Sequence, residues 1–483
     1  MIHISPFAPR TVLLAGLLSL LTTLPAAAFE TSRWHADYAA LKAALAATYA
    51  NLDTQVRARK IDLAALDRET TLAIDRAEND VEAARALGEM LKVFADGHLR
   101  LLPPAPAAVP ATATEPVPRK TCAELGYRAP RSRGVDGSRL HRFDALGTAD
   151  DAHFPAGVLK LDGGRTLGML RISLFGEDGY PGLCETVMAA RAKAGATGGG
   201  TAGCDRTCAA EVWREVGGEM TRALVRQVRE LARREVAAIV IDLTGNGGGS
   251  EWVEQAARVV ASPGLASQRM GFIKHPHWVK RFDRRIAAID TDLAATDLAE
   301  PLRTLLVAQR ERLAALRAAA VAPCERSGIW RGEAACDLVM GGEHFTSGLL
   351  PARPKETLQS LKSAAVLFGP RGDPADDGAY RGRLAILIDG KTASAAEQFA
   401  AMLKDAGAAT LIGEKTLGAG CGYTDGGVSV VLPNSGMRVR MPDCVRFRKD
   451  GGNEVLGLMP DIAVAPGRTD ALMRALAAWV ALA

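Results

Sequence analysis

The sequence is poor in several features that mark particular classes of protein. Only 5% of its 483 residues are aromatic, and the net charge of +4 is spread along the chain without a long basic run. This argues against nucleic acid as the main partner, because nucleic-acid-binding domains concentrate basic residues on one face. After residue 28 no apolar stretch is long enough to span a bilayer, so we expect no membrane span in the mature chain.

Motifs for cofactors and metals are also missing. The glycine-rich stretch 193–210 is not followed by the lysine–serine pair of a phosphate loop. The glycine turn at 245–249 lacks the spacing of a dinucleotide-binding turn. Cys204 and Cys208 could chelate a metal ion, but without a second close pair of ligands a zinc site is not expected. We therefore expect no cofactor and no metal.

Residues 1–28 have the pattern of a secretory signal. Arg10 precedes an apolar run at 11–24, and a proline and three alanines follow that run. A positive region, an apolar core and a small-residue cleavage site together define such a signal. The alternative is a membrane anchor, for which the apolar run is short. We expect a secreted, periplasmic protein.

The eight cysteines all follow the predicted signal. An even number of cysteines in a secreted protein favours disulfide bonds, although the sequence does not fix their connectivity. We expect Cys324–Cys336 and Cys421–Cys444, because each pair brackets a short segment that can fold back.

Amino-acid composition and the spacing of apolar residues divide the chain into four parts. Residues 1–28 are the signal, and residues 29–102 carry apolar positions at helical spacing, which predicts a helical N-terminal domain. Residues 103–157 begin with a tract of proline, alanine and threonine and read as a linker. Residues 158–483 form the main domain, with insertions expected at about 185–210 and 265–345, the second a helical hairpin.

Two short apolar runs in the main domain predict its fold. Residues 237–243 end in a glycine turn before a helix at 252–260, and residues 384–388 end in Asp-Gly before a helix from 393. Continuous apolar runs of this length predict strands buried on both faces. Strands that alternate with helices indicate an α/β fold with a parallel sheet.

Ser394 lies at the second of these strand-to-helix turns. Its hydroxyl would face the positive end of a helix, beside the unpaired N–H of Ala395. Such a donor can hold the oxyanion of a tetrahedral intermediate, and the glycine turn with Gly247 and Gly248 could supply a second donor. The alternatives are a helix N-cap for Ser394 and a simple tight turn for the glycines.

Four motifs in order, VIDLTGNGGG, DGKTASAAE, IGEKTLG and EVLGLMPDI, resemble those of the C-terminal-processing (tail-specific) serine peptidases. This family includes the tricorn core protease and the interphotoreceptor retinoid-binding repeats. The resemblance implies a crotonase- or ClpP-like α/β core preceded by helices. It places Ser394 on the family nucleophile, and Ala395 with Gly247 or Gly248 on the oxyanion donors.

The resemblance also narrows the choice of general base. The serine–lysine branch has its lysine in an FGKG motif, but the corresponding position here is Ala419, and neither Lys391 nor Lys415 matches that motif. The tricorn-like branch uses a histidine and a glutamate, which fall on His98 in DGHLRL and on Glu454. Glu454 would orient His98 directly or through a bridging group. Gly97 replaces the serine of that branch, so the orienting network must differ.

These observations together predict a secreted serine endopeptidase that acts on peptides or unfolded proteins through an acyl-enzyme on Ser394. Two other functions fit the same sequence. One is a non-catalytic ligand- or peptide-binding protein on this fold, and the other is an esterase or amidase that acts on small molecules.

Overall fold

The computed structural model describes residues 29–106, 121–130, 140, 142–195, 204–261, 264–333, 336–354, 358, 360–370, 372–424 and 427–482. The predicted signal at 1–28 lies outside the described residues. Within these ranges, none of the helices has the length and apolar character needed to cross a membrane.

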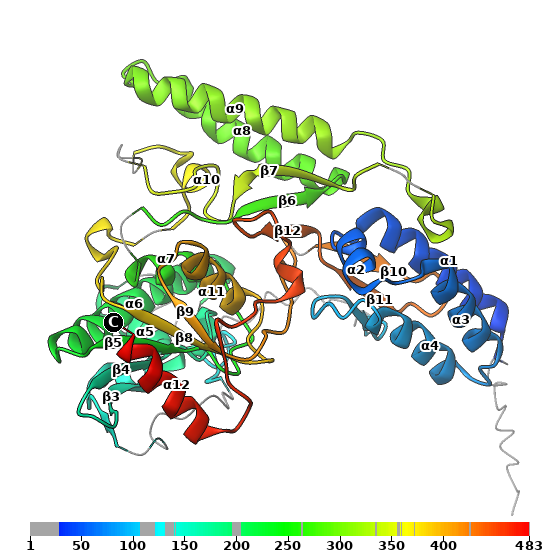
Figure 1. Cartoon of the computed structure of the whole chain (residues 1–483). Coiled ribbons are helices and arrows are strands. Elements are labelled where there is room, and N and C mark those ends of the chain that lie inside the picture. The colour runs from blue at the N-terminus through cyan, green and yellow to red at the C-terminus, as the bar shows by residue number, and fades with distance from the viewer. Residues whose placement is uncertain are drawn as a thin grey trace, which may run out of the picture.

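A mixed seven-stranded sheet forms the centre of the molecule (Figure 1). Its order is β13-β9-β8-β5-β4-β3-β2, with parallel pairing from β13 to β4 and antiparallel pairing from β4 to β2. The strands are β2 (Phe143–Ala145), β3 (Ala156–Lys160), β4 (Thr166–Arg171), β5 (Ala238–Asp242), β8 (Leu384–Ile388), β9 (Thr410–Gly413) and β13 (Ile462–Ala463). The predicted α/β fold is confirmed, and the sheet is parallel over five of its seven strands.

Helices cover both faces of this sheet. The central strands β5 and β8 are therefore buried along their whole length, as their continuous apolar sequences require. One face packs against α5 (Pro181–Lys193), α6 (Arg206–Arg233), α7 (Trp252–Val259) and α11 (Ala395–Asp405). The other face packs against α12 (Thr469–Ala481). Successive strand residues divide between the faces, so Ile239 joins the first cluster and Val240 the second.

The N-terminal segment consists of four helices: α1 (Thr31–Thr48), α2 (Leu52–Arg59), α3 (Leu63–Asp75) and α4 (Asp80–Lys92). They lie at one end of the molecule (Figure 1). Their apolar side chains form one core with a three-stranded antiparallel sheet, β1 (Arg100–Leu102), β11 (Arg438–Met441) and β10 (Val428–Val431). The front of the chain is therefore anchored on residues from near its end.

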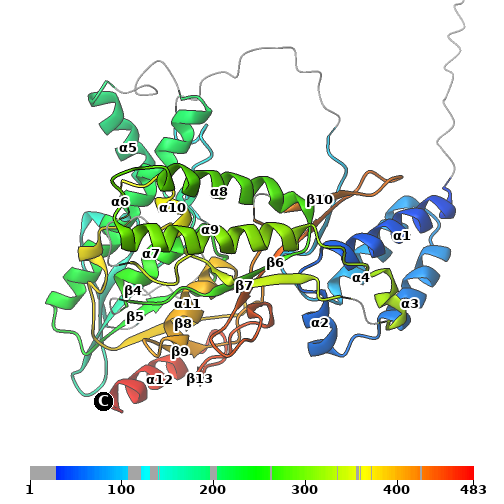
Figure 2. The ribbon, with the colours of Figure 1, turned by 90° about the horizontal axis from the view of Figure 1, so that it is seen from above.

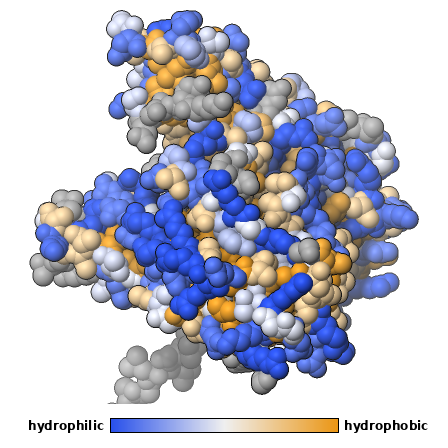
Figure 3. Space-filling model, turned by 60° about the vertical axis from the view of Figure 1, so that its left-hand side comes forward, coloured by the Kyte–Doolittle hydropathy of each residue, from blue (hydrophilic) through white to orange (hydrophobic). Residues whose placement is uncertain are grey.

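The predicted insertion at 265–345 contains a helical hairpin of α8 (Val279–Leu293) and α9 (Glu300–Ala320). Pro301 occupies the first turn of α9, where a missing N–H costs nothing. The hairpin lies over β6 (Arg269–Ile273) and β7 (Val339–Phe345) (Figure 2). β6 is the central strand of a small sheet and pairs with both β7 and β12 (Cys444–Phe447). On the face in Figure 3 it projects clear of the rest of the molecule. The short α10 (Ala364–Leu367) follows this segment.

The segment 185–210, predicted as an insertion, is partly helical and partly buried where the structure describes it. α5 continues to Lys193, α6 begins at Arg206, and Cys184, Val187 and Cys208 are buried in the main core. These residues are buried because α5 and α6 each have apolar side chains at helical spacing on the face that packs against the core. Residues 196–203 lie outside the described residues.

Four disulfide bonds are present. The predicted pairs Cys324–Cys336 and Cys421–Cys444 are confirmed. The other pairs are Cys122–Cys184 and Cys204–Cys208, so the cysteines considered above as metal ligands are bonded to each other.

The insertion and the N-terminal helices share a core, which gives a stability prediction. Trp330 is 5% exposed, packs in the N-terminal cluster and donates its indole N–H to the carbonyl of Lys42 at 3.1 Å. Trp330→Ala should lower the free energy of unfolding by about 3–5 kcal/mol, because it leaves a large cavity. Trp213, which is 37% exposed, provides the control: Trp213→Ala should cost less than about 1 kcal/mol. Urea unfolding of both variants measures the difference, and equal losses would contradict this packing.

Candidate active site

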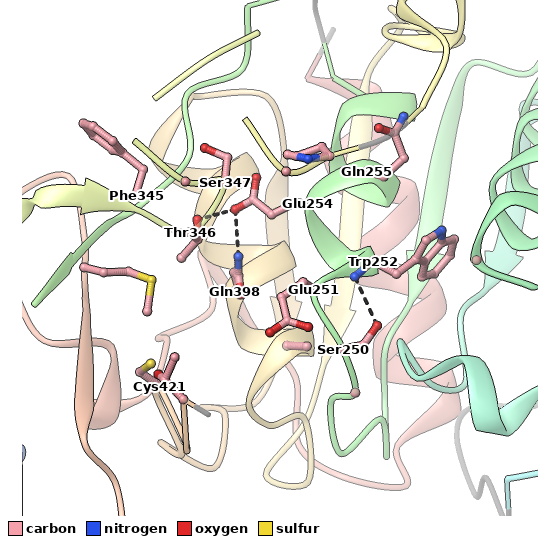
Figure 4. A pocket seen from close by; sticks show the side chains of 18 of the residues that line it. Ser250, Glu251, Trp252, Glu254, Gln255, Phe345, Thr346, Ser347, Gln398 and Cys421 are labelled. Atoms are coloured by element: carbon pink, nitrogen blue, oxygen red, sulfur yellow. Dashed lines mark hydrogen bonds between the residues drawn. The ribbon is translucent and has the colours of Figure 1, made fainter. Parts of the chain in front are cut away.

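A cavity of about 720 Å³ brings together candidate site residues that are far apart in the sequence. His98, Ser394 and Ala395 all line it, although His98 is almost three hundred residues from the other two (394 − 98 = 296). Residues of α7, α11 and β7 form much of its wall (Figure 4). There the Glu254 carboxylate, which is 2% exposed, accepts hydrogen bonds from Thr346 and Gln398.

Ser394 has a backbone conformation that non-glycine residues rarely adopt. Its φ is +55° and its ψ is −117°, at the end of the turn that joins β8 to α11. Such strain persists only where the surroundings hold it, and it occurs often at functional sites. Gly248 lies directly against it: a β-carbon on Gly248 would be 2.7 Å from Ser394 Cβ and 2.9 Å from Ala395 N. Only glycine fits there.

The glycine turn offers fewer free donors than the sequence indicated. The N–H of Gly248 donates to Asn246 Oδ1 at 2.9 Å, and Gly247 does not line the cavity. Gly249 does line it, and among the described residues its N–H has no hydrogen-bond acceptor. The same holds for the N–H of Ala395 in the first turn of α11. Two residues with such backbone donors, Gly249 and Ala395, therefore line the same cavity as Ser394.

The ring of His98 is held in one orientation. Its Nδ1 lies 2.9 Å from the carbonyl oxygen of Ala419, which can only accept a hydrogen bond. Nδ1 therefore carries the proton, and Nε2 is left with a lone pair in the neutral ring. The Tyr423 ring packs edge-on against His98, and its hydroxyl donates to the His98 carbonyl. No hydrogen bond joins the His98 ring to Ser394 Oγ in the part of the chain that the structure describes.

The surroundings of His98 lower its pKa to about 4. Burial is the largest cause, because it disfavours the charged ring. The positive charges of Arg446, Arg100 and Arg440 act in the same direction, and the Ala419 carbonyl opposes them. His98 is therefore a neutral base across a wide range of pH.

Glu454 does not contact His98. This carboxylate is 1% exposed, accepts from Arg446 Nε at 2.9 Å, and accepts from Gln268 Nε2 at 2.7 Å. Arg446 in turn donates to the carbonyl oxygens of Ser394 and Gly420, both at 2.8 Å. Arg446 thus links Glu454 to the backbone on either side of the site, and among the described residues neither side chain forms a hydrogen bond with the His98 ring.

Glu397 is a member of the site that the sequence reasoning missed. Its carboxylate is fully buried and accepts from the N–H groups of Ser394 at 2.9 Å and Ala419 at 2.9 Å. It also accepts from the Gly418 N–H at 2.7 Å and the Thr416 hydroxyl at 2.5 Å. Glu397 thus connects Ser394 to the loop whose carbonyl holds His98. A signal was available, since Ser394 and Glu397 have the Ser-x-x-Glu spacing of a capping box.

The lysines considered as alternative bases lie elsewhere. Neither Lys391 nor Lys415 lines the cavity, and no other lysine of the described residues does. Nor do those residues contain a group of three or more histidine, cysteine, aspartate or glutamate side chains suited to a metal ion.

Comparison with known proteins agrees with this architecture. Residues 211–464 match the sequence profile of peptidase family S41. The fold resembles crystal structures of mature CPAF (TM-score 0.50) and of a CPAF mutant (TM-score 0.53), each 12% identical in sequence. Both alignments cover 93% of this chain and 96% of that chain, which shows a shared fold. No curated protein sequence matches the chain.

The packing around His98 predicts the effect of a single added methyl group. A β-carbon on Gly422 would lie 3.0 Å from His98 Nε2 and would displace the ring by a few tenths of an ångström. If His98 is the general base, Gly422→Ala should lower kcat/KM about tenfold, because small misplacements of a catalytic group are costly. Gly88→Ala, a helix position with open space around it, is the control and should leave kcat/KM unchanged. Full activity of Gly422→Ala would show that this ring position is not critical.

The lowered pKa of His98 predicts an unusual pH profile. If neutral His98 is the base, kcat/KM should hold from pH 7 to pH 5 and fall by half near pH 4. A histidine with an ordinary pKa of about 6.5 would already have lost most activity at pH 5. Circular dichroism at each pH separates this loss from unfolding. An inflection near pH 6 would contradict the lowered pKa of His98; it would fit a histidine of ordinary pKa or Asp96, which accepts from the His98 N–H at 2.9 Å and whose pKa burial raises to about 6.

Proposed function

The chain belongs to peptidase family S41 and is a serine-type peptidase, and we propose that it cleaves peptide bonds through an acyl-enzyme on Ser394 with His98 as general base. The observation that carries this proposal is the His98–Ala419 hydrogen bond. It leaves Nε2 as the proton acceptor in a cavity that Ser394 also lines.

The proposed reaction follows the usual course of acyl transfer. His98 Nε2 takes the proton from Ser394 Oγ as the oxygen attacks the carbonyl carbon of the substrate. The N–H groups of Ala395 and Gly249 stabilise the oxyanion that forms. His98 returns the proton to the leaving amine, and a water molecule then hydrolyses the acyl-enzyme with the same base.

In this proposal Glu454 acts through Arg446 and not on the imidazole. The Arg446 guanidinium donates to the carbonyl oxygens of Ser394 and Gly420, which fixes the backbone at the nucleophile and beside Ala419. Glu454 and Gln268 hold that guanidinium in place. The role that the sequence resemblance gave to a glutamate is therefore one of positioning.

We also propose that the protein works outside the cytoplasm, in the periplasm. The predicted signal and the four disulfide bonds support this location, because disulfides persist in oxidising compartments. The substrate would be a peptide or an unfolded protein.

Substitution of the two proposed catalytic residues tests the mechanism. Ser394→Ala should abolish cleavage of a casein-like substrate, and His98→Ala should lower kcat/KM on the order of a thousandfold or more, because the two groups act as a unit. A serine-directed phosphonate should label the wild-type chain and not Ser394→Ala. The control is Lys415→Ala, which should stay active.

Three outcomes would contradict the mechanism. Residual full cleavage by Ser394→Ala would reject the nucleophile. An active His98→Ala with an inactive Lys415→Ala would favour a serine–lysine mechanism. Absence of labelling and of cleavage in a folded wild-type chain would favour a binding protein on the same fold.

A further inference from the structure

Three arginines lie on one face of the small sheet next to the proposed base. In the antiparallel pairing of β1 with β11, Arg100 is directly opposite Arg440. Arg438 lies two residues along β11 and so shares the face of Arg440. We call Arg100, Arg438 and Arg440 the arginine strip. Like charges directly opposite each other weaken a sheet, so this arrangement needs a reason other than stability.

The strip has no carboxylate partner among the described residues. Arg100 Nε donates to the Gly97 carbonyl at 3.0 Å, and Arg438 Nε donates to the Pro103 carbonyl at 3.1 Å. The guanidinium of Arg440 stacks 3.7 Å from the centre of the Tyr423 ring. A guanidinium group has five N–H donors, and these contacts use at most one of them on each side chain. Most of the donors therefore remain available to a ligand.

The strip lies next to the active-site cavity, on the other side of Tyr423. Tyr423, under Arg440, lines the cavity and packs against His98 with ring centres 5.3 Å apart. Arg100 follows His98 by two residues, and the charges of Arg100 and Arg440 act on the His98 ring. In Figure 1, β10 and β11 lie beside the N-terminal helices. None of the three arginines itself lines the cavity, so a ligand would have to extend from His98 past Tyr423 to reach the strip.

Two carboxylates in this region are buried and already bonded. Asp96 is 7% exposed and accepts from Tyr49 and Asn51, both at 2.9 Å. Glu454 is held by Arg446 and Gln268. Neither is placed to neutralise the strip, so its positive charge faces the ligand.

We propose that the arginine strip is a subsite for a carboxylate of the bound peptide. The proposal rests on the peptidase function above and names the chemistry of its substrate. A guanidinium group matches the two oxygens of a carboxylate with two parallel hydrogen bonds, which makes arginine the residue suited to this recognition. The carboxylate has two sources: an aspartate or glutamate side chain near the scissile bond, or the C-terminus of the peptide.

Peptide binding to the full-length Ser394→Ala chain tests the subsite without requiring turnover. Fluorescence anisotropy would compare labelled peptides that carry glutamate or glutamine, each with a free or an amidated C-terminus. At low salt we expect the carboxylate to tighten binding about tenfold, as for a charge-assisted hydrogen bond at a partly exposed site. A glutamate effect identifies the side chain as the source, and an effect of the free terminus identifies the C-terminus.

Two double variants locate the effect. Arg100→Gln with Arg440→Gln should remove the tenfold preference. Arg68→Gln with Arg85→Gln, two exposed arginines of the N-terminal helices, should retain it. Arg100→Lys with Arg440→Lys keeps the charge but loses the paired donors, so it should retain a reduced preference. Circular dichroism confirms that each variant is folded.

Several results would overturn the proposal. One is equal affinity for peptides with and without the carboxylate. Another is a preference that survives in the Arg100/Arg440 glutamine variant. Binding of duplex DNA that is as tight as peptide binding, and is lost in the same variant, would show a general polyanion site instead. If Ser394→Ala still cleaved peptides, the proposed mechanism would fail while the binding comparison stood, so the two failures are distinct.

Discussion

The buried carboxylate of Glu397 is the interaction on which the rest of the active site depends. It accepts hydrogen bonds from the N–H of Ser394 on one side and from the N–H groups of Gly418 and Ala419 on the other. Burial and the nearby Glu454 both raise its pKa, but several donors compensate the charge. A carboxylate with this many charge-assisted bonds helps to fix the distance between the two loops, together with Arg446 and the hydrogen bond from the Leu417 N–H to the Thr392 carbonyl.

This link explains how a strained serine and a distant histidine come to share one cavity. Ser394 keeps its positive φ because Glu397 holds its N–H, Arg446 holds its carbonyl, and Gly248 leaves room beside it. His98 keeps its tautomer because Glu397 positions the loop that carries the Ala419 carbonyl. Position 419 holds alanine where the serine–lysine branch has its lysine, so no lysine base is available there. The backbone carbonyl of Ala419 instead orients the His98 ring.

The core that the N-terminal helices share with the C-terminal strands determines where His98 lies. His98 lies directly before β1, and β1 pairs with β11, so the position of the ring depends on that sheet. The disulfide Cys421–Cys444 further ties the loop beside His98 to β12, the strand that carries Arg446. A chain with separate helical and catalytic cores would leave the ring free to move relative to Ser394.

The sequence by itself determined the elements and the chemical type of the site. Buried strands at 238–242 and 384–388, the turns after them and the helix behind Ser394 follow from apolar runs and turn residues, which are local properties. The two short-range disulfides follow from spacing for the same reason. Only the tertiary structure decided that Glu454 pairs with Arg446, that Gly249 and not Gly247 borders the cavity, and that Glu397 joins the two loops. These outcomes depend on which buried donors meet which acceptors across long chain separations, and local periodicity contains no information about that.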